Sequence, residues 1–286
     1  MHVIGRLIRE SGKFKIGLGI TLLLIIVSFL SPWLVSLLIG DKDPLKAGSF
    51  TLFLDPNSEN WLGTDRFGRD VLSMVLAALP VSMLVAFLAG LLSTAVGVIV
   101  GFVSGYKGGR TDSILRTITD MCIVIPTLPL IIVLAANTRS LGSVRLALVL
   151  AMFSWPFAAR VIRTQVMSLR ERPYIELARI SNMPDRSIIF GEILPNMAPF
   201  VAIGFAQASV GSAFALVGLT VIGLGPSNQM DLGRLISEAL GYGVISMGKE
   251  LIFIAPVFVL IMLFYGLALM SQGMEEFFNP RLRSGS

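Results

Sequence analysis

The sequence is poor in charged residues, which make up 14% of its 286 residues, whereas hydrophobic residues make up 54%. Soluble domains carry about 25% charged residues, so this chain has too few to cover a globular surface in water. The same scarcity excludes a disordered chain, which is polar and rich in charge. Together with a mean hydropathy of +0.80, it predicts an integral membrane protein.

Cysteine and histidine are almost absent. Cys122 is the single cysteine and His2 the single histidine, which excludes a disulfide scaffold, multi-cysteine metal sites and zinc motifs with paired histidines. The chain also lacks the G-x-x-x-x-G-K-[ST] pattern of a P-loop, whose backbone and lysine hold nucleotide phosphates. We therefore expect no catalytic site, no metal and no cofactor on this chain.

Six apolar stretches have about the 20 residues that a helix needs to cross a bilayer. They predict membrane helices at 16–39, 80–106, 113–136, 144–161, 198–224 and 251–270. Pro126 and Pro129 lie inside the third, where they predict a kink within a bundle. The first stretch is too long for a cleavable signal and has no clean small-x-small site after it, so we expect it to be retained.

The distribution of charge predicts the orientation. If both termini are cytoplasmic, 15 of the 23 basic residues lie on the inner side and 8 on the outer side, while the 18 acids divide equally. This is the positive-inside bias of membrane proteins. The net charge of +5 therefore reflects basic inner loops, and we expect no nucleic-acid partner.

Ionisable residues deep in the predicted spans are scarce, whereas ion-coupled carriers keep such residues near the membrane midplane. The deepest is Asp120, four residues after Arg116, and we interpret the two as an ion pair that anchors a helix end. Cys122 is interpreted as an inert packed thiol. A carrier or channel that works alone and an assembly scaffold stay open as alternatives, but this pattern does not favour the carrier.

The predicted inner loop at 163–196 carries clear helix signals. Pro173 suits the first residue of a helix, where its missing N–H costs little, and Glu176 falls in the first turn, which favours acids. Asn182 can end that helix because asparagine tolerates the left-handed conformation. The loop therefore predicts a helix over 173–181, then a second short helix with Asp185 as its N-cap that ends before Pro195.

One face of the first loop helix is apolar but small. Tyr174, Leu177, Ala178 and Ser181 recur at i, i+3, i+4 and i+7 and therefore share a face. A short helix of this kind either lies in a groove of a partner protein or rests on its own bundle or on lipid headgroups. The spacing alone favours neither.

This loop resembles the EAA loop of ABC-importer permeases in Glu176-Leu177-Ala178, Asn182 and Ile193-Leu194-Pro195. The usual form of that loop has Glu-Ala-Ala and a later glycine, so here Leu177 replaces an alanine and Asn182 the glycine. Further segments resemble the family in the same order, from about residue 60 to the end: Leu62-Gly63-Thr64-Asp65 with Gly68-Arg69-Asp70, Gly105-Tyr106 with Gly108-Gly109, Asp112, 168–174, Gly223-Leu224-Gly225 and 279–283.

Two of these segments also have a physical interpretation. Gly105, Gly108 and Gly109 predict a tight turn on the inner side, because glycine adopts conformations that other residues avoid. Thr64-Asp65 could cap a short outer helix. The segment can equally be a structured outer connection, which is the interpretation that we prefer.

The resemblance is specific to the C-type inner-membrane subunit of dipeptide and oligopeptide importers. It implies an all-α integral membrane protein with six transmembrane helices, the type I ABC importer permease fold and a cytoplasmic coupling helix. It divides the chain into an N-terminal segment with the first helix and outer connection (1–75), a five-helix permease core (76–275) and a cytoplasmic tail (276–286). It also implies that the residues that couple to the ATPase are Tyr174, Glu176, Leu177, Ala178, Arg179 and Asn182.

The same resemblance implies partners. These are a homologous second permease, two ATP-binding subunits that hold ATP and Mg²⁺, and an extracytoplasmic solute-binding protein, in the lipid bilayer of a prokaryotic inner membrane. The chain itself would not be an enzyme, since ATP is hydrolysed by the partner subunits. Peptides are the first expected solute, and oligosaccharides or nickel are the alternatives within this family.

Overall fold

The structure is a computed structural model that describes residues 7, 9–137, 142–226 and 229–278. The described residues form helices and connecting loops, with a single isolated bridge between Thr64 and Asp70. The elements in chain order are α2 (Gly12–Ile39), α3 (Val71–Lys107), α4 (Gly109–Val124), α5 (Thr127–Asn137), α6 (Ser143–Arg170), α7 (Pro173–Ile180), α8 (Asp185–Ser187), the π-helix η1 (Ile188–Ile193), α9 (Leu194–Val221), α10 (Leu232–Gly241) and α11 (Leu251–Phe278).

Within the described residues, five helical stretches are long and apolar enough to cross a membrane: α2, α3, α6, α8 to α9 (Asp185–Val221), and α11. The third predicted span, 113–136, is not continuous. It breaks into α4 and α5 at Ile125, whose backbone is extended with ψ of 124°. A residue before proline avoids the helical conformation and proline has no N–H to donate, so Ile125-Pro126 ends one helix where a kink was expected.

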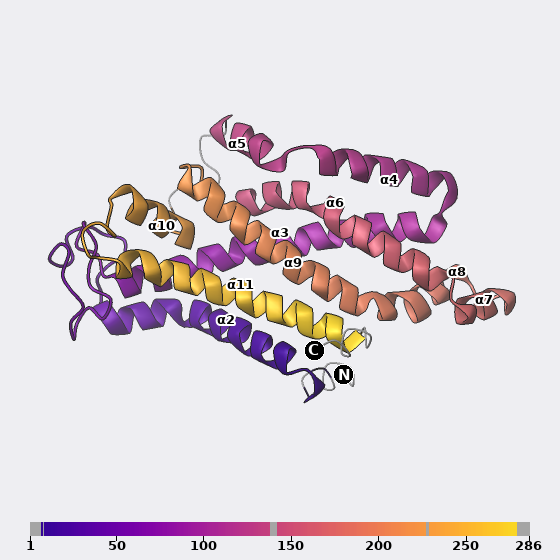
Figure 1. Ribbon diagram of the computed structural model, residues 1–286, viewed down its shortest axis with the longest axis horizontal. Helices are drawn as coiled ribbons and strands as arrows, with labels where there is room; N and C mark the ends of the chain where they lie inside the picture. Colours follow the sequence, from indigo (N-terminus) through magenta and orange to yellow (C-terminus); the bar gives the residue numbers. More distant parts are fainter. Residues whose placement is uncertain (1–6, 8, 138–141, 227–228, 279–286) are drawn as a thin grey trace.

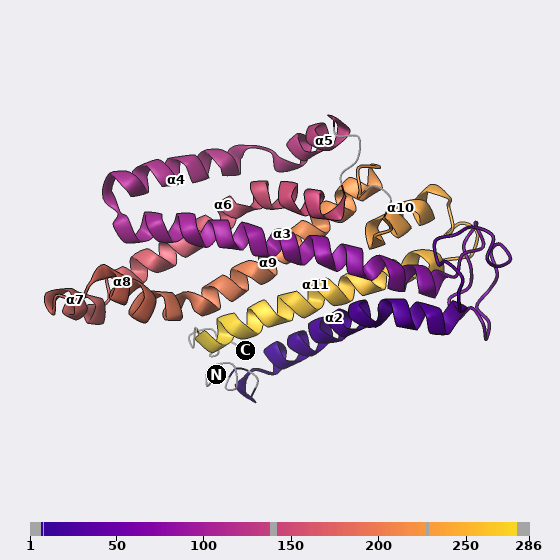
Figure 2. The same cartoon turned by 180° about the vertical axis from the view of Figure 1, so that it is seen from behind.

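The long helices lie side by side in an elongated bundle (Figure 1, Figure 2). One end carries the 40–70 connection and α10, and is called the α10 end. The other carries the α3–α4 turn and the protruding α7 and α8, and is called the α7 end (Figure 1). The first residues of α2 and the last of α11 point toward the α7 end, and α4 with α5 runs along the bundle between the two ends.

Glycines let α3 and α6 approach to backbone distance. A Cβ added at Gly97 would lie 2.5 Å from the Ala158 Cβ, and one at Gly101 would lie 2.5 Å from the Ala159 carbonyl oxygen. At Gly105, it would lie 2.8 Å from the carbonyl oxygen of Arg163. Small residues at every fourth position are a common device for packing membrane helices, because lipid provides no hydrophobic driving force.

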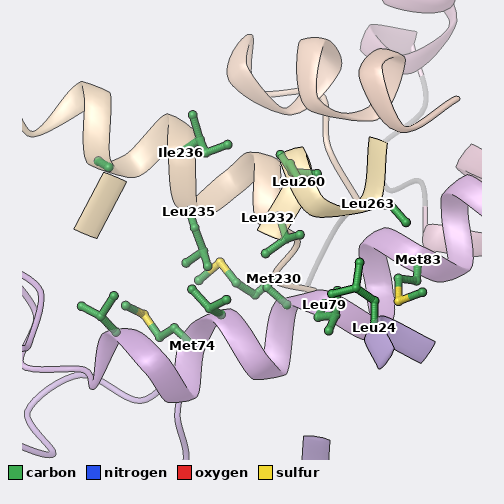
Figure 3. Packing of buried hydrophobic residues seen from close by; sticks show 14 of the residues in the cluster. Leu24, Met74, Leu79, Met83, Met230, Leu232, Leu235, Ile236, Leu260 and Leu263 are labelled. Carbon is green, nitrogen blue, oxygen red and sulfur yellow. The ribbon is translucent and has the colours of Figure 1, made fainter. Parts of the chain in front are cut away.

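The apolar core is concentrated near the α10 end. Leu232 and Leu235 of α10 point toward Met74 and Leu79 of α3 (Figure 3), and Ile236 belongs to the same cluster. Leu24 of α2 and Leu260 and Leu263 of α11 complete this cluster (Figure 3). The non-spanning helix α10 is therefore fixed to three of the long helices by burial of aliphatic side chains.

Large apolar side chains also remain exposed along the long helices, including Phe29, Trp33, Ile99, Phe258 and Ile261. Such a surface is unfavourable in water but matches the hydrocarbon core of a bilayer. The exposed apolar surface thus agrees with the membrane location that composition predicts.

Candidate functional site

The inner loop begins with α7, whose limits agree with the sequence. Pro173 is its first residue and Glu176 lies in its first turn. Asn182 has a φ of 54°, the left-handed conformation that was expected to end the helix. Its backbone N–H donates to the Arg179 carbonyl oxygen at 3.0 Å, and that of Met183 donates to the Ala178 carbonyl oxygen at 3.0 Å.

The second half of the loop differs from the prediction. Asp185 is the first residue of α8 and makes no side-chain cap, because Pro184 occupies the N-cap position. The short helix also does not end before Pro195: it continues through η1 into α9, in which Pro195 is the second residue. A π-turn widens the helix and changes its hydrogen-bond register, so the chain passes the missing N–H of Pro195 without a break.

The predicted apolar face of α7 divides between the bundle and the outside. Ile175, which the spacing argument missed, is fully buried in a cluster with Ile162, Val166, Ile188, Ile193 and Met197, and Ala178 packs against this cluster. Tyr174 and Leu177 are exposed, at 39% and 63%. Ile180 at 72% and Met183 at 40% extend the exposed apolar surface. The interpretation that the helix rests on its own bundle is therefore confirmed for the face with Ile175 and Ala178. The groove of a partner protein stays a prediction for the exposed face, where the polar Glu176 and Arg179 are exposed as well.

Tyr106 connects the α3–α4 turn to this loop. Its hydroxyl donates to Asp185 Oδ1 at 2.6 Å, and the Arg179 guanidinium lies 5.8 Å from the centre of its ring. Its carbonyl oxygen accepts a hydrogen bond from Arg170 Nη1 at 3.0 Å. The fold thus brings Tyr106 of one sequence signature beside Arg179 and Asp185 of another.

The glycines of the α3–α4 turn have two different roles. Gly108 and Gly109 have φ of 64° and 55°, as expected of a tight turn that favours glycine. The prediction for Gly105 was wrong, because it lies inside α3 and serves the close contact with α6. Residues 105–109 thus contain glycines of two kinds, one that packs α3 against α6 and two that form the turn.

Ion pairs fasten α4 to α6 near the same end. Arg163 donates from Nη2 to Asp112 Oδ2 at 2.6 Å, and the Ser104 hydroxyl donates to Asp112 Oδ1 at 2.6 Å. Asp120 pairs with Arg116 at 3.6 Å, as the sequence predicted, and also with Arg160 at 2.6 Å. The anchoring role expected for Asp120 therefore extends across two helices.

The 62–70 signature at the α10 end forms a buried turn. The Thr64 hydroxyl donates to the Thr51 carbonyl oxygen at 2.7 Å and accepts from the Leu54 N–H at 2.8 Å, while Leu62 packs at the edge of the core. The predicted cap was wrong: no helix follows Thr64-Asp65 directly, and the residue that caps α3 is Asp70, which accepts from the Ser73 N–H at 2.8 Å.

Glycine is required in this turn. Gly63 and Gly68 have φ of 74° and 67°, and an added Cβ would lie within 2.4 Å and 2.1 Å of the carbonyl oxygens of Leu54 and Phe50. The preferred interpretation of the segment, a structured connection, agrees with this geometry.

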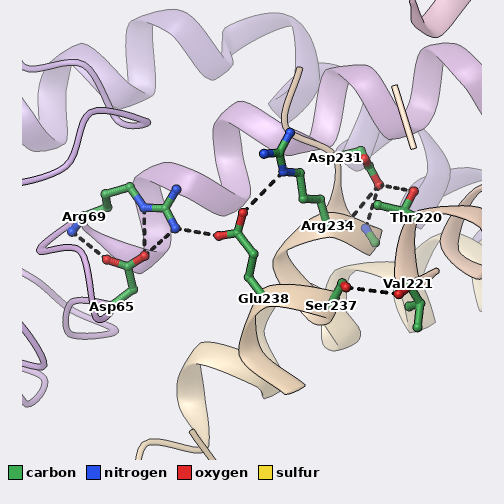
Figure 4. A network of polar contacts seen from close by, with 9 residues as sticks. Asp65, Arg69, Thr220, Val221, Asp231, Arg234, Ser237 and Glu238 are labelled. Carbon is green, nitrogen blue, oxygen red and sulfur yellow. Dashed lines mark hydrogen bonds and ion pairs between the residues drawn. The ribbon is translucent and has the colours of Figure 1, made fainter. Parts of the chain in front are cut away.

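Arg69 joins the turn to α10. Its Nε donates to Asp65 Oδ2 at 2.7 Å and its Nη2 donates to Glu238 Oε2 at 2.7 Å (Figure 4). The side chains of Arg69 and Asp65 are only 9% and 7% exposed. Asp231 caps α10 by accepting from the backbone N–H groups of Gly233 and Arg234 (Figure 4). Burial raises the pKa of the Asp231 carboxyl to about 6, although these N–H groups act in the opposite direction.

A large cavity of about 1080 Å³ lies between α6 and α9. Sequence reasoning did not find it, since its walls come from segments far apart in the chain. Elsewhere, no group of three histidine, cysteine or acidic residues that could hold a metal ion occurs among the described residues. The signature predicted at 279–283 lies outside the described residues.

Comparison with known proteins agrees with this architecture. A family model described as "Binding-protein-dependent transport system inner membrane component" matches residues 97–284. The oligopeptide transport system permease protein OppC of Mycobacterium tuberculosis (strain ATCC 25618 / H37Rv) is 30% identical over 285 residues, covering 99% of this chain and 94% of the relative. DppC of Haemophilus influenzae, a dipeptide permease, is 31% identical, covering 94% of this chain and 90% of the relative.

A third relative, the glutathione transport system permease protein GsiD of Pectobacterium atrosepticum, is 28% identical over 283 residues, covering 98% of this chain and 90% of the relative. The family is non-catalytic, and its description implies ATPase and binding-protein partners. The all-helical fold with its long apolar helices and the matches over nearly the full length lead to one conclusion. This chain belongs to the family of inner membrane permease components of binding-protein-dependent ABC importers.

Proposed function

We propose that this chain forms half of the translocation pathway of a peptide importer and that α7 couples it to separate ATP-binding subunits. The observation that carries the coupling role is the two-sided geometry of α7. Ile175 anchors it in the bundle, while Tyr174, Leu177 and Ile180 present an apolar surface away from it. An exposed short helix with apolar anchors is suited to a groove of a partner protein.

The proposed assembly contains a homologous second permease, two ATP-binding subunits that hold ATP and Mg²⁺, and an external solute-binding protein. The α7 end faces the cytoplasm, which agrees with the basic residues at that end. The first residues of α2 and the last of α11 point toward the same side (Figure 1). In this arrangement α4 and α5 together make a sixth, broken crossing. A broken helix is tolerated in a membrane where neighbouring helices cover its backbone.

Coupling would proceed by rigid-body movement. Closure of the ATP-binding subunits displaces α7, and the buried Ile175 transmits the displacement to α6, η1 and α9, which supply the rest of its cluster. The exposed Glu176 and Arg179 provide polar contacts at the joint, while Tyr174 and Leu177 fill the groove. Ala178 supports the helix from the bundle side, and Asn182 fixes the angle at which the chain leaves it.

Peptides are the proposed solute. The three relatives described above are named for oligopeptide, dipeptide and glutathione transport, and each aligns with 94% or more of this chain. Oligosaccharides and nickel are the alternatives, and uptake measurements with each solute separate them.

The coupling role is tested with Leu177→Arg in the assembled transporter. A charge on this exposed surface prevents seating in an apolar groove, so we expect solute-stimulated ATP hydrolysis to fall more than tenfold. Gly12→Arg introduces the same charge at an exposed residue of α2, where an added Cβ meets no atom within 4 Å. It lies away from α7 and from the outer face, so it serves as the matched control and leaves hydrolysis unchanged. Full stimulation in Leu177→Arg, or ion-driven uptake by the purified chain alone, would show that the proposal is wrong.

A further inference from the structure

The cavity between α6 and α9 has a polar group at the centre of its wall. Gln207 lies at the midpoint of α9 (Leu194–Val221), is exposed and lines the cavity. Leaving an amide in hydrocarbon without hydrogen-bond partners costs several kcal/mol. A polar side chain at that depth therefore faces water or protein.

The cavity wall formed by α9 has no side chains at several positions, because these positions are glycines. Gly204, Gly211 and Gly218 line the cavity at every seventh residue of α9, and an added Cβ at each would meet no atom within 4 Å. This open space distinguishes them from the glycines of α3, which are in contact with α6. The absence of side chains at these positions leaves room for a passing chain.

Charge is confined to the inner part of the cavity. Among the described lining residues, the charged ones are Arg160 and Glu275, and Arg160 is paired with Asp120 at 2.6 Å. Further out, the lining includes Phe153 and Phe214. Thr94 also lines the cavity, is only 3% exposed, and its hydroxyl has no hydrogen-bond partner within the part of the chain that the structure describes.

We infer that this cavity is a water-filled wall of the solute pathway, and that Gln207 is a solute-contact residue for the uncharged backbone of a peptide. The Gln207 amide both donates and accepts, as a peptide group does. The phenylalanines accommodate apolar side chains. Among the described lining residues, Glu275 is the single acid and no histidine or cysteine occurs, so a divalent cation would lack the set of ligands that it needs. The inference rests on the proposed function and names its contact site.

The chain is well suited to a test by thiol labelling, because Cys122 is its single cysteine. In a Cys122→Ser background, Gln207→Cys is compared with Ile261→Cys, an exposed residue on the outer surface of α11. Both variants are assembled with the second permease and the ATP-binding subunits in lipid nanodiscs. A charged, membrane-impermeant thiosulfonate then reports whether water reaches each position.

We expect Gln207→Cys to react at least tenfold faster than Ile261→Cys. Trialanine delivered by the solute-binding protein should slow the labelling at Gln207→Cys at least threefold, whereas maltotriose and nickel chloride should not. Slow labelling at both positions would overturn the inference, since it would mean that packed protein or lipid covers this face. Protection by maltotriose or nickel, or no protection by trialanine, would also overturn it.

A second variant, Gln207→Leu, distinguishes failure of the solute-contact role from failure of the proposed function. Gln207→Leu should lower the trialanine transported per ATP hydrolysed about tenfold, while Gln207→Asn, which keeps the amide, retains most of it. Wild-type uptake of peptide driven by ATP, combined with an unaffected Gln207→Leu, contradicts only the solute-contact role. Absence of ATP-driven peptide uptake in the wild type contradicts the proposed function itself, and the inference with it.

Discussion

At the α10 end, polar groups hold the non-spanning segments by pairing with one another inside the protein, as Arg69 does with Asp65 and Glu238. At the α7 end, the non-spanning helix is held by the fully buried Ile175 with the half-buried Ala178 beside it, while its larger apolar side chains are exposed. At the α10 end, the charged groups therefore have partners within the chain. At the α7 end, an apolar surface stays open to another molecule. In the proposed assembly, the paired polar groups keep the α10 end rigid, and the exposed apolar side chains of α7 contact the ATP-binding subunits.

The largest effect is expected from breaking the polar network at the α10 end. Arg69→Met removes the partner of two carboxylates, one of them nearly buried, and loss of one member of a buried ion pair costs about 3–5 kcal/mol. We expect a marked fall in the unfolding temperature of the purified chain in detergent. Arg66→Met, at an exposed neighbour whose guanidinium lies over the rings of Phe67 and Tyr242, should change it much less. Equal falls in the unfolding temperature for both variants would show that the Arg69 network does not hold the α10 end rigid.

The next effect concerns the anchor of α7. Ile175→Ala leaves a cavity in the cluster beneath the helix, and such truncations cost about 2–5 kcal/mol. We expect faster hydrogen exchange over 173–183 and loss of solute-stimulated ATP hydrolysis. Ile180→Ala, at an exposed site on the same helix, should leave exchange unchanged while weakening association with the ATP-binding subunits. If Ile180→Ala loosened the helix as well, the division into anchored and contacting faces would be wrong.

The α10 end should also respond to pH through Asp231. Its folded-state pKa is raised by burial from the ordinary 3.8 to about 6, so folding favours the neutral carboxyl. Its contribution to stability is full below pH 3.8 and is lost as the pH rises through 6, an effect of about 3 kcal/mol. Asp231→Asn keeps a capping oxygen and should abolish this slope in hydrogen exchange of α10. A slope that persists in Asp231→Asn would assign the titration to another group.

The smallest effect is expected at the link between Tyr106 and Asp185. Tyr106→Phe removes one hydrogen bond, which contributes about 1 kcal/mol, so the chain should fold and assemble normally. We expect a several-fold loss of solute-stimulated ATP hydrolysis, because the α3–α4 turn no longer holds the loop after α7. Asp185→Ala should give the same loss, and the double variant no more than either single one. Additive losses would show that the two residues act separately.

The sequence predicted local features well and long-range ones poorly. Pro173 and Asn182 specify the limits of α7 through backbone preferences of their own, so the helix was found without a structure. The break at Ile125-Pro126 was expected only as a kink, because whether proline bends or ends a membrane helix depends on what surrounds it. The π-turn before Pro195 was missed because a helix was assumed to stop ahead of a proline.

The candidate site shows the same limit. Arg69 and Glu238 are separated by 169 positions, and nothing local marks them as partners. Gly105 was assigned to a turn, since glycine signals conformational freedom and close packing alike. Ile175 escaped notice because its partners, among them Ile162 and Ile193, come from other elements. The cavity could not be found at all, because open space is a property of the packed helices and not of any segment.

The glycines of α3 have a mechanical consequence. Where Gly97, Gly101 and Gly105 bring α6 to backbone distance, one helix cannot slide along the other without steric clash. When the displacement of α7 reaches α6, α3 and α6 should therefore move together as one rigid unit. Any opening of the solute pathway must then occur between α6 and α9, because the glycines of α9 face open space and do not hold these two helices together.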